Sequence, residues 1–265
     1  MRQYIYGPFQ SRRLGLSLGV NILPNYKLCT FNCVYCEIGI TNNKNLASPE
    51  HRIKLPPSFN FRKELVSILT LVPHLDSITF GYNGEPTLNE NILDFLEITS
   101  KERDKLSWTK QKPRLTLFTN SSTLHYNEIR DKVRQFEFVL AKLDVATSED
   151  LKRTNRPHKN SPKIETIIAS LVKLMQEMPK NHELAVQCLL IDSYRDDFIP
   201  NNNPLNINKL AHALKRIKPN YVQIYSTARI PAEYFVFAID NERKREIATI
   251  IKEIIDDDKV EINIY

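Results

Sequence analysis

Two kinds of residue that are scarce in this chain of 265 residues limit what it can be. With only four cysteines, it lacks the dense cysteine framework of small secreted domains that are held together by disulfides. It also has only six glycines, and all of them lie between Gly7 and Gly84. Glycine allows positive φ and close approach of the backbone to a ligand. We therefore expect the chemistry in the first third of the chain and scaffold in the rest.

The sequence also has no signal peptide and no apolar run long enough to cross a bilayer. These absences predict a cytoplasmic protein with no membrane partner, whose cysteines are reduced thiols or metal ligands. A net charge of +6 and a pI near 9.0 favour anionic partners such as nucleic acids. Any single basic cluster is more often a solvated helix face, so charge alone identifies no site.

Strand-like runs alternate with helical patterns through most of the chain. The strand-like runs cover 16–23, 77–82, 115–119, 136–145, 184–191 and 221–226, and the helical patterns cover 62–71, 92–105, 127–134, 163–178, 207–217 and 242–256. Such alternation implies parallel strands joined by right-handed crossovers. Six βα units are too few for a closed eight-stranded barrel, and they fit an α/β fold with an open, partial (β/α)6 TIM-like barrel.

No composition break or Gly/Ser-rich linker divides the chain. We predict a single domain over residues 1–265, with an N-terminal extension at 1–15 and a C-terminal helix and tail at 240–265. Alternate positions along the strands separate an apolar face from a polar one. The polar face carries Lys142, Asp144 and Gln187 near the carboxyl ends of the strands, where barrel enzymes place their chemistry.

The strongest local signal is the run Cys29-Thr30-Phe31-Asn32-Cys33-Val34-Tyr35-Cys36. Three thiols on one short loop can turn toward one point, which suits an iron–sulfur cluster or a zinc ion. No fourth cysteine lies nearby, so the simplest interpretation is a 4Fe-4S cluster with one iron left open for a substrate or cofactor. The alternatives are a zinc site completed by Cys188 or by a histidine such as His51, and chance clustering of buried thiols. Strand parity points Cys188 toward the helix layer, which predicts a buried thiol.

The Cys-x3-Cys-x2-Cys spacing, with Tyr35 just before the last cysteine, resembles the radical S-adenosylmethionine (radical SAM) superfamily. The resemblance implies that Cys29, Cys33 and Cys36 hold a 4Fe-4S cluster whose open iron chelates S-adenosylmethionine. It further implies reductive cleavage to a 5'-deoxyadenosyl radical, which abstracts hydrogen from a substrate. A one-electron donor such as flavodoxin or ferredoxin would supply the electron.

Several residues at strand ends resemble those that contact the cofactor in this superfamily. Asn83-Gly84-Glu85-Pro86 resembles the glycine–glutamate motif, which receives the methionyl ammonium, and a carboxylate complements an ammonium. The other cofactor-contact candidates are Tyr35, Asn120, Lys142, Asp144 and Gln187. For Lys142 and Asp144 a buried structural ion pair is an equal alternative.

A narrower resemblance, to the group related to tRNA wyosine synthases, covers most of the chain. It is carried by Gly-Pro-Phe-Gln-Ser-Arg-Arg-Leu-Gly, Asn-Gly-Glu-Pro-Thr-Leu, Arg-Thr-Asn-Arg-Pro-His and Thr-x-Arg-x-Pro-Ala-Glu. The cysteines of that group's second cluster are absent, which makes wyosine formation itself doubtful and leaves the substrate open. Basic residues expected to receive an anionic substrate, such as tRNA, are Arg12, Arg13, Arg153, Arg156, His158 and Arg229.

Other functions also fit the sequence. One is a glycyl-radical activase or a peptide-modifying radical SAM enzyme. Another, from a different class, is a zinc-stabilised nucleic-acid-binding module without catalysis.

Overall fold

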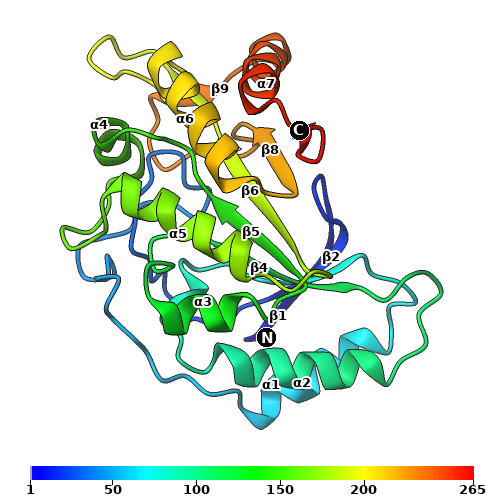
Figure 1. The fold of residues 1–265 in the computed structure, drawn as a ribbon. Helices are drawn as coiled ribbons and strands as arrows, with labels where there is room; N and C mark the ends of the chain where they lie inside the picture. Colours follow the sequence, from blue (N-terminus) through cyan, green and yellow to red (C-terminus); the bar gives the residue numbers. More distant parts are fainter. Residues whose placement is uncertain (1) are drawn as a thin grey trace.

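A computed structural model describes residues 2–265, and its main feature is one eight-stranded, mostly parallel sheet (Figure 1). The strand order is β1-β2-β3-β4-β5-β6-β8-β10. The strands are β1 (Ile5–Ser11), β2 (Gly15–Val20), β3 (Ser77–Phe80), β4 (Arg114–Thr119), β5 (Phe138–Lys142), β6 (Glu183–Leu189), β8 (Tyr221–Tyr225) and β10 (Glu261–Ile264). Only β1 runs antiparallel to its neighbour, and over residues 2–265 the sheet is open between β1 and β10.

Six helices pack their apolar sides into one core with the sheet (Figure 1). They are α1 (Phe59–Leu69), α2 (Ile92–Asp104), α3 (Asn127–Val133), α5 (Ile164–Glu177), α6 (Pro204–Ile217) and α7 (Asn241–Ile255). Local sequence sets their ends. For example, Asn203 caps α6 by accepting from the Asn206 N–H, and α6 ends at Lys218 with a left-handed φ. No helix within residues 2–265 is both long and apolar enough to cross a bilayer.

The predicted strands and long helices are confirmed to within a few residues, and so is the apolar, helix-covered face of the sheet. The opposite face is polar only in part, because Phe138, Leu140 and Ala185 form an apolar cluster on it. Ile78, Leu117 and Val139 lie in the helix-covered core, whereas the opposite face joins hydroxyl groups across neighbouring strands. Ser17 Oγ lies 2.7 Å from Thr79 Oγ1, and Ser77 Oγ lies 2.8 Å from Thr116 Oγ1. These hydroxyl groups lie toward the amino ends of β2, β3 and β4 and satisfy one another's hydrogen bonds inside the sheet.

The sequence prediction omitted the outermost strands and one small sheet. The extension at 1–15 contains β1, and the C-terminal tail contains β10, so the sheet has two strands more than the six predicted. A two-stranded sheet joins β7 (Ile191–Ser193) to β9 (Val236–Ala238), and a short helix α4 (Ser148–Asp150) leads into the turn η2 (Leu151–Asn155). These pieces are too short for a periodic signal, and Pro8 in β1 suggested a turn.

Candidate functional site

The three cysteines of the predicted metal site lie on the loop that follows β2, and they line one cavity of about 140 Å³. The other lining residues are Lys27, Phe31, Tyr35, Ile38, Gly84, Phe118, Thr119, Asn120 and Lys142. Lys142 ends β5, and Asn120 follows the last residue of β4. The cysteine loop therefore lies at the carboxyl end of the parallel sheet.

One side-chain nitrogen donor lies within hydrogen-bond distance of each of the three sulfurs. The distances are 3.1 Å from Lys27 Nζ to Cys36 Sγ, 3.4 Å from Asn120 Nδ2 to Cys29 Sγ and 3.5 Å from Asn155 Nδ2 to Cys33 Sγ. Such donors favour the negatively charged thiolate over the thiol. Hydrogen bonds of this kind also tune the properties of a metal centre bound to the sulfur.

Three thiols that line one cavity fit the ligand set of an iron–sulfur cluster. Within residues 2–265, no group of three or more Cys, His, Asp or Glu side chains is placed to hold one metal ion. In a cubane cluster each thiolate binds a different iron, so sulfurs spread around a cavity need not converge on one point. Burial is the larger cause and the neighbouring thiol the next; together they raise the pKa of Cys29 to about 12 and that of Cys33 to about 11. Metal charge would therefore be needed to hold them as thiolates.

The residues considered for completing a zinc site lie elsewhere. Cys188 is fully buried in the core that the sheet shares with the helices, as strand parity predicted. His51 is exposed, and neither residue lines the cysteine cavity. The structure thus brings together three of the four thiols of the chain.

The Gly84 backbone is pressed against the start of the cysteine loop. Gly84 pairs with Leu28 in a short parallel bridge, and the Glu85 N–H donates to the Leu28 carbonyl at 3.0 Å. Gly84 has φ +132°, and a Cβ atom there would lie 1.7 Å from the Leu28 carbonyl oxygen. Of the predicted Asn83–Pro86 motif, only Gly84 lines the cavity. Asn83 instead donates to the Pro24 carbonyl at 2.9 Å and anchors the turn.

Glu85 is 1% exposed and points into the protein, between the ends of β3 and β4. Its carboxylate accepts from the Thr87 hydroxyl at 2.6 Å, the Thr119 hydroxyl at 2.8 Å and the Asn120 N–H at 2.6 Å. Burial raises the pKa of Glu85, although these hydrogen bonds oppose the shift. This carboxylate joins the glycine turn to the residue that donates to Cys29.

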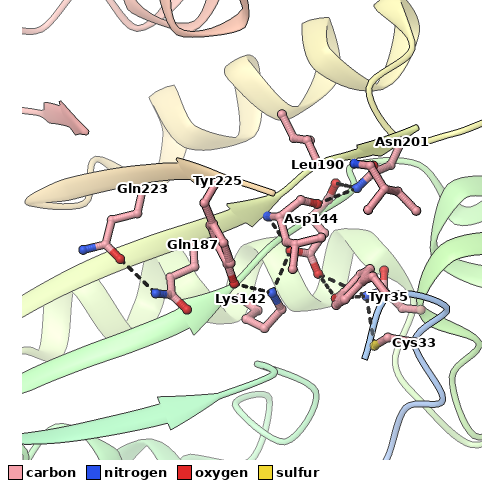
Figure 2. A network of polar contacts seen from close by, with 12 residues as sticks. Cys33, Tyr35, Lys142, Asp144, Gln187, Leu190, Asn201, Gln223 and Tyr225 are labelled. Atoms are coloured by element: carbon pink, nitrogen blue, oxygen red, sulfur yellow. Dashed lines mark hydrogen bonds and ion pairs between the residues drawn. The ribbon is translucent and has the colours of Figure 1, made fainter. Parts of the chain in front are cut away.

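A second polar network joins the cysteine loop to the ends of β5, β6 and β8 (Figure 2). Lys142 Nζ lies 3.1 Å from Asp144 Oδ1 and 2.8 Å from the Tyr225 hydroxyl. Asp144 is buried, and it accepts from the Tyr35 hydroxyl and from Asn155 Nδ2, the latter at 3.1 Å. The ion pair that was the alternative to cofactor contact is therefore present, and Lys142 also lines the cysteine cavity.

The charge of Asp144 affects the pKa values of its neighbours Lys142 and Tyr35. Burial alone would lower the pKa of Lys142, but the nearby Asp144 carboxylate and Tyr225 raise it, so Lys142 is a cation. Burial and the charge of Asp144 raise the pKa of Tyr35, which keeps its hydroxyl a donor. Gln187 bonds to Gln223 at 2.8 Å in a separate pair deeper along the strands (Figure 2).

No family model matches the chain. Its sequence is 30% identical over 262 residues to a UPF0026 protein of Methanocaldococcus jannaschii, covering 97% of this chain and 74% of that protein. The chain belongs to the UPF0026 family. A UPF0026 protein of Synechocystis sp. is 28% identical over 225 residues, which are 85% of this chain and 76% of that protein.

Solved structures share the fold of this UPF0026 chain. TYW1 with a lysine-pyruvate adduct bound has a TM-score of 0.58 at 16% identity, over 89% of this chain and 73% of that chain. Streptococcus suis SuiB bound to S-adenosylmethionine has a TM-score of 0.59 at 11% identity, over 93% of this chain. The UPF0026 chain spans about half of the SuiB chain, at 50%. At such identities the likeness to these two proteins shows the fold alone.

Most of the predicted substrate arginines of the UPF0026 chain are paired with acidic groups. Arg153 pairs with Asp150, Arg156 pairs with Glu233, and Arg229 lies 3.4 Å from Glu37. His158 is tied to the cysteine loop, because its N–H donates to the Thr30 carbonyl at 2.9 Å. The expected basic rim is therefore partly neutralised.

The two arginines before β2 differ from each other. Arg12 is exposed. The guanidinium carbon of Arg13 lies 4.2 Å from the centre of the Tyr225 ring. The hydroxyl of the same tyrosine accepts from Lys142 Nζ. The Nε and Nη1 atoms of Arg13 are buried without a hydrogen-bond partner among residues 2–265. Two buried donors without acceptors are costly even on a half-buried side chain, so an anion or water bound there would relieve this cost.

Sequence reasoning missed two of the three donors to sulfur, Lys27 and Asn155. Lys27 lies two residues before Cys29, and proximity to the motif was the one signal that could have singled it out. Asn155 lies more than one hundred residues away, in the turn η2. The run Arg-Thr-Asn-Arg-Pro-His singled out this segment, but only the packing of the turn against the cysteine loop shows that its asparagine reaches Cys33.

Proposed function

We propose that this UPF0026 protein is a radical SAM enzyme that binds a 4Fe-4S cluster through Cys29, Cys33 and Cys36. The observation that carries the proposal is that these cysteines line one cavity at the carboxyl end of the sheet, each with a nitrogen donor to its sulfur. When bound, the cluster would supply one electron to S-adenosylmethionine, whose cleavage gives a 5'-deoxyadenosyl radical. The shared fold with S-adenosylmethionine-bound SuiB supports this reading.

The residues of the chain would bind and orient S-adenosylmethionine next to the cluster. Gly84 lets its backbone lie against the cysteine loop, where a side chain would collide. Asn120 and Lys142 line the same cavity and present an amide and a cation to the polar groups of the cofactor. Glu85 would act by holding the glycine turn and Asn120 in place, since its own oxygens are engaged within the protein.

Within the proposal, the six parallel strands β2, β3, β4, β5, β6 and β8 form the open (β/α)6 barrel, and β1 and β10 extend its two edges. Arg13 would bind an anionic group of the substrate, because two of its nitrogen atoms are buried without acceptors in the described chain. An anionic substrate such as tRNA, a flavodoxin or ferredoxin as electron donor, and a reducing cytoplasmic location belong to the same proposal.

The test is anaerobic reconstitution of the purified full chain with iron and sulfide. We expect a brown protein whose visible absorption bleaches with dithionite, and production of 5'-deoxyadenosine when S-adenosylmethionine is added. Cys33→Ser should lose cluster binding and deoxyadenosine together. Zinc as the only bound metal, or unchanged deoxyadenosine production by Cys33→Ser, would refute the proposal.

A further inference from the structure

A second, larger hollow borders the cysteine loop at Asn32. It has a volume of about 590 Å³, and its lining residues are Asn32, Leu46, Ser148, Leu151, Lys152, Arg156, Pro157, His158, Lys159, Ser161, Pro162 and Lys163. No acidic side chain is among them. We call this feature the basic groove.

The lysines of the basic groove carry uncompensated charge. Arg156 is paired with Glu233, but Lys152, Lys159 and Lys163 form no ion pair with any residue between 2 and 265. Three cations and His158 around a hollow without a carboxylate create a local positive potential. Such a potential favours a ligand with several negative charges.

The basic groove is built onto the cysteine loop. The Asn32 N–H donates to the carbonyls of Asn155 and Arg156 at 3.0 and 3.1 Å, and Phe31 pairs with Pro157 in an antiparallel bridge. Leu151 lines both the basic groove and a small inner cavity that is also lined by Asn120, Lys142 and Asp144. A ligand held in the basic groove would therefore lie next to the candidate active site.

Exposed aromatic rings lie on a segment that is bonded both to the cysteine loop and to the basic groove, since Glu233 pairs with Arg156. Tyr194, Tyr234 and Phe237 are 59%, 76% and 44% exposed. The rings of Tyr194 and Phe237 are nearly parallel, with an angle of 10° between planes and 6.4 Å between centres. This segment is tied to the cysteine loop, because the Glu233 N–H donates to the Val34 carbonyl at 2.9 Å. We call these three rings the aromatic patch.

We propose that the basic groove and the aromatic patch together bind a single-stranded segment of nucleic acid. The lysines would contact phosphates, and the exposed rings would stack on unpaired bases, which is how proteins hold single strands. An acidic peptide would use the lysines but would leave the rings without a role. The inference deepens the proposed function by naming the substrate class presented to that site.

The test is binding of a fluorescein-labelled single-stranded RNA, and of DNA of the same sequence, measured by fluorescence anisotropy at several salt concentrations. Replacing Lys152, Lys159 and Lys163 with glutamine should weaken binding at least tenfold at about 0.1 M salt. It should also make the slope of log K against log salt shallower by about 2, since each phosphate contact on a single strand contributes about 0.7. Tyr194→Ala with Tyr234→Ala should weaken binding roughly tenfold or more and leave the slope unchanged.

The matched control replaces Lys173, Lys180 and Lys209, which are also exposed, with glutamine and so makes the same change in net charge. Equal weakening by this control would show that only overall charge matters, and competition by polyglutamate as strong as that by RNA would show that the ligand class is wrong. Far-UV circular dichroism checks that each variant is folded. Because binding needs neither reductant nor S-adenosylmethionine, nucleic-acid binding without deoxyadenosine production would refute the proposed function alone.

Discussion

Gly84 gives the sharpest test of how the cysteine loop is positioned. Replacing Gly84 with alanine places a methyl carbon 1.7 Å from the Leu28 carbonyl oxygen and 2.5 Å from the Leu28 carbonyl carbon. Both are backbone atoms directly before Cys29, so no side chain can rotate away to make room. The variant must therefore displace the start of the cysteine loop or the turn after β3.

Gly84→Ala lowers the stability of the folded protein for two reasons. A non-glycine residue at positive φ costs on the order of 1–3 kcal/mol. Overpacking in a close-packed region costs about 1–3 kcal/mol more. We expect Gly84→Ala to lower the free energy of unfolding by roughly 2–6 kcal/mol as the sum of these ranges. Urea unfolding of the metal-free protein, followed by far-UV circular dichroism, measures this loss.

Gly39 provides the matched control for Gly84. It also has positive φ, at +81°, but nothing lies within 4 Å of an added Cβ. Gly39→Ala should therefore show the backbone cost alone, about 1–3 kcal/mol. If the two variants lose equal stability, the contact with Leu28 is not what requires glycine at position 84, and the reasoning fails.

Three further outcomes are expected. Lys27→Met removes a cation 3.1 Å from Cys36 Sγ and should lower the reduction potential of the cluster by on the order of 50–100 mV. A redox titration followed by electron paramagnetic resonance measures this potential, and an unchanged value would contradict the prediction. Burial alone would raise the pKa of Glu137, but Arg103 and a backbone N–H hold it below 4.5, so the stabilisation is present above that pH and is lost in acid. Glu137→Gln should therefore cost about 1–3 kcal/mol at pH 7. In urea titrations this difference should shrink as the pH falls below 4.5, and a difference independent of pH would contradict the pairing. Cys188→Ala should leave the iron content unchanged, and loss of iron would make Cys188 a ligand.

The repeating part of the fold was predictable because its signals are local and periodic. The strands around Ile78, Leu117 and Val139 alternate apolar and polar positions, and parity alone placed Cys188 in the helix-covered core. The cysteine spacing likewise located the candidate metal site before any geometry was known. Three thiols within eight residues must lie on one loop, whatever the rest of the chain does.

What could not be predicted depends on contacts between distant segments. The sequence placed Glu85 beside the glycine turn but could not show that its carboxylate faces inward to Thr87, Thr119 and Asn120. The ion pairs of the expected basic rim could not be predicted either, because the partners are remote in sequence. Arg156 pairs with Glu233, and Arg229 pairs with Glu37. Side-chain direction at loop positions follows from tertiary packing, which no single-sequence period encodes.

The backbone bonds that tie the cysteine loop to η2 and to the segment before β9 have a consequence for assembly. Asn32, Val34 and His158 hold this loop in a defined shape with protein atoms alone. A preformed site spends little of its metal affinity on ordering polypeptide, in contrast to small zinc domains, in which metal binding and folding are one event. Under the proposed function, cluster binding would therefore spend little free energy on ordering this loop.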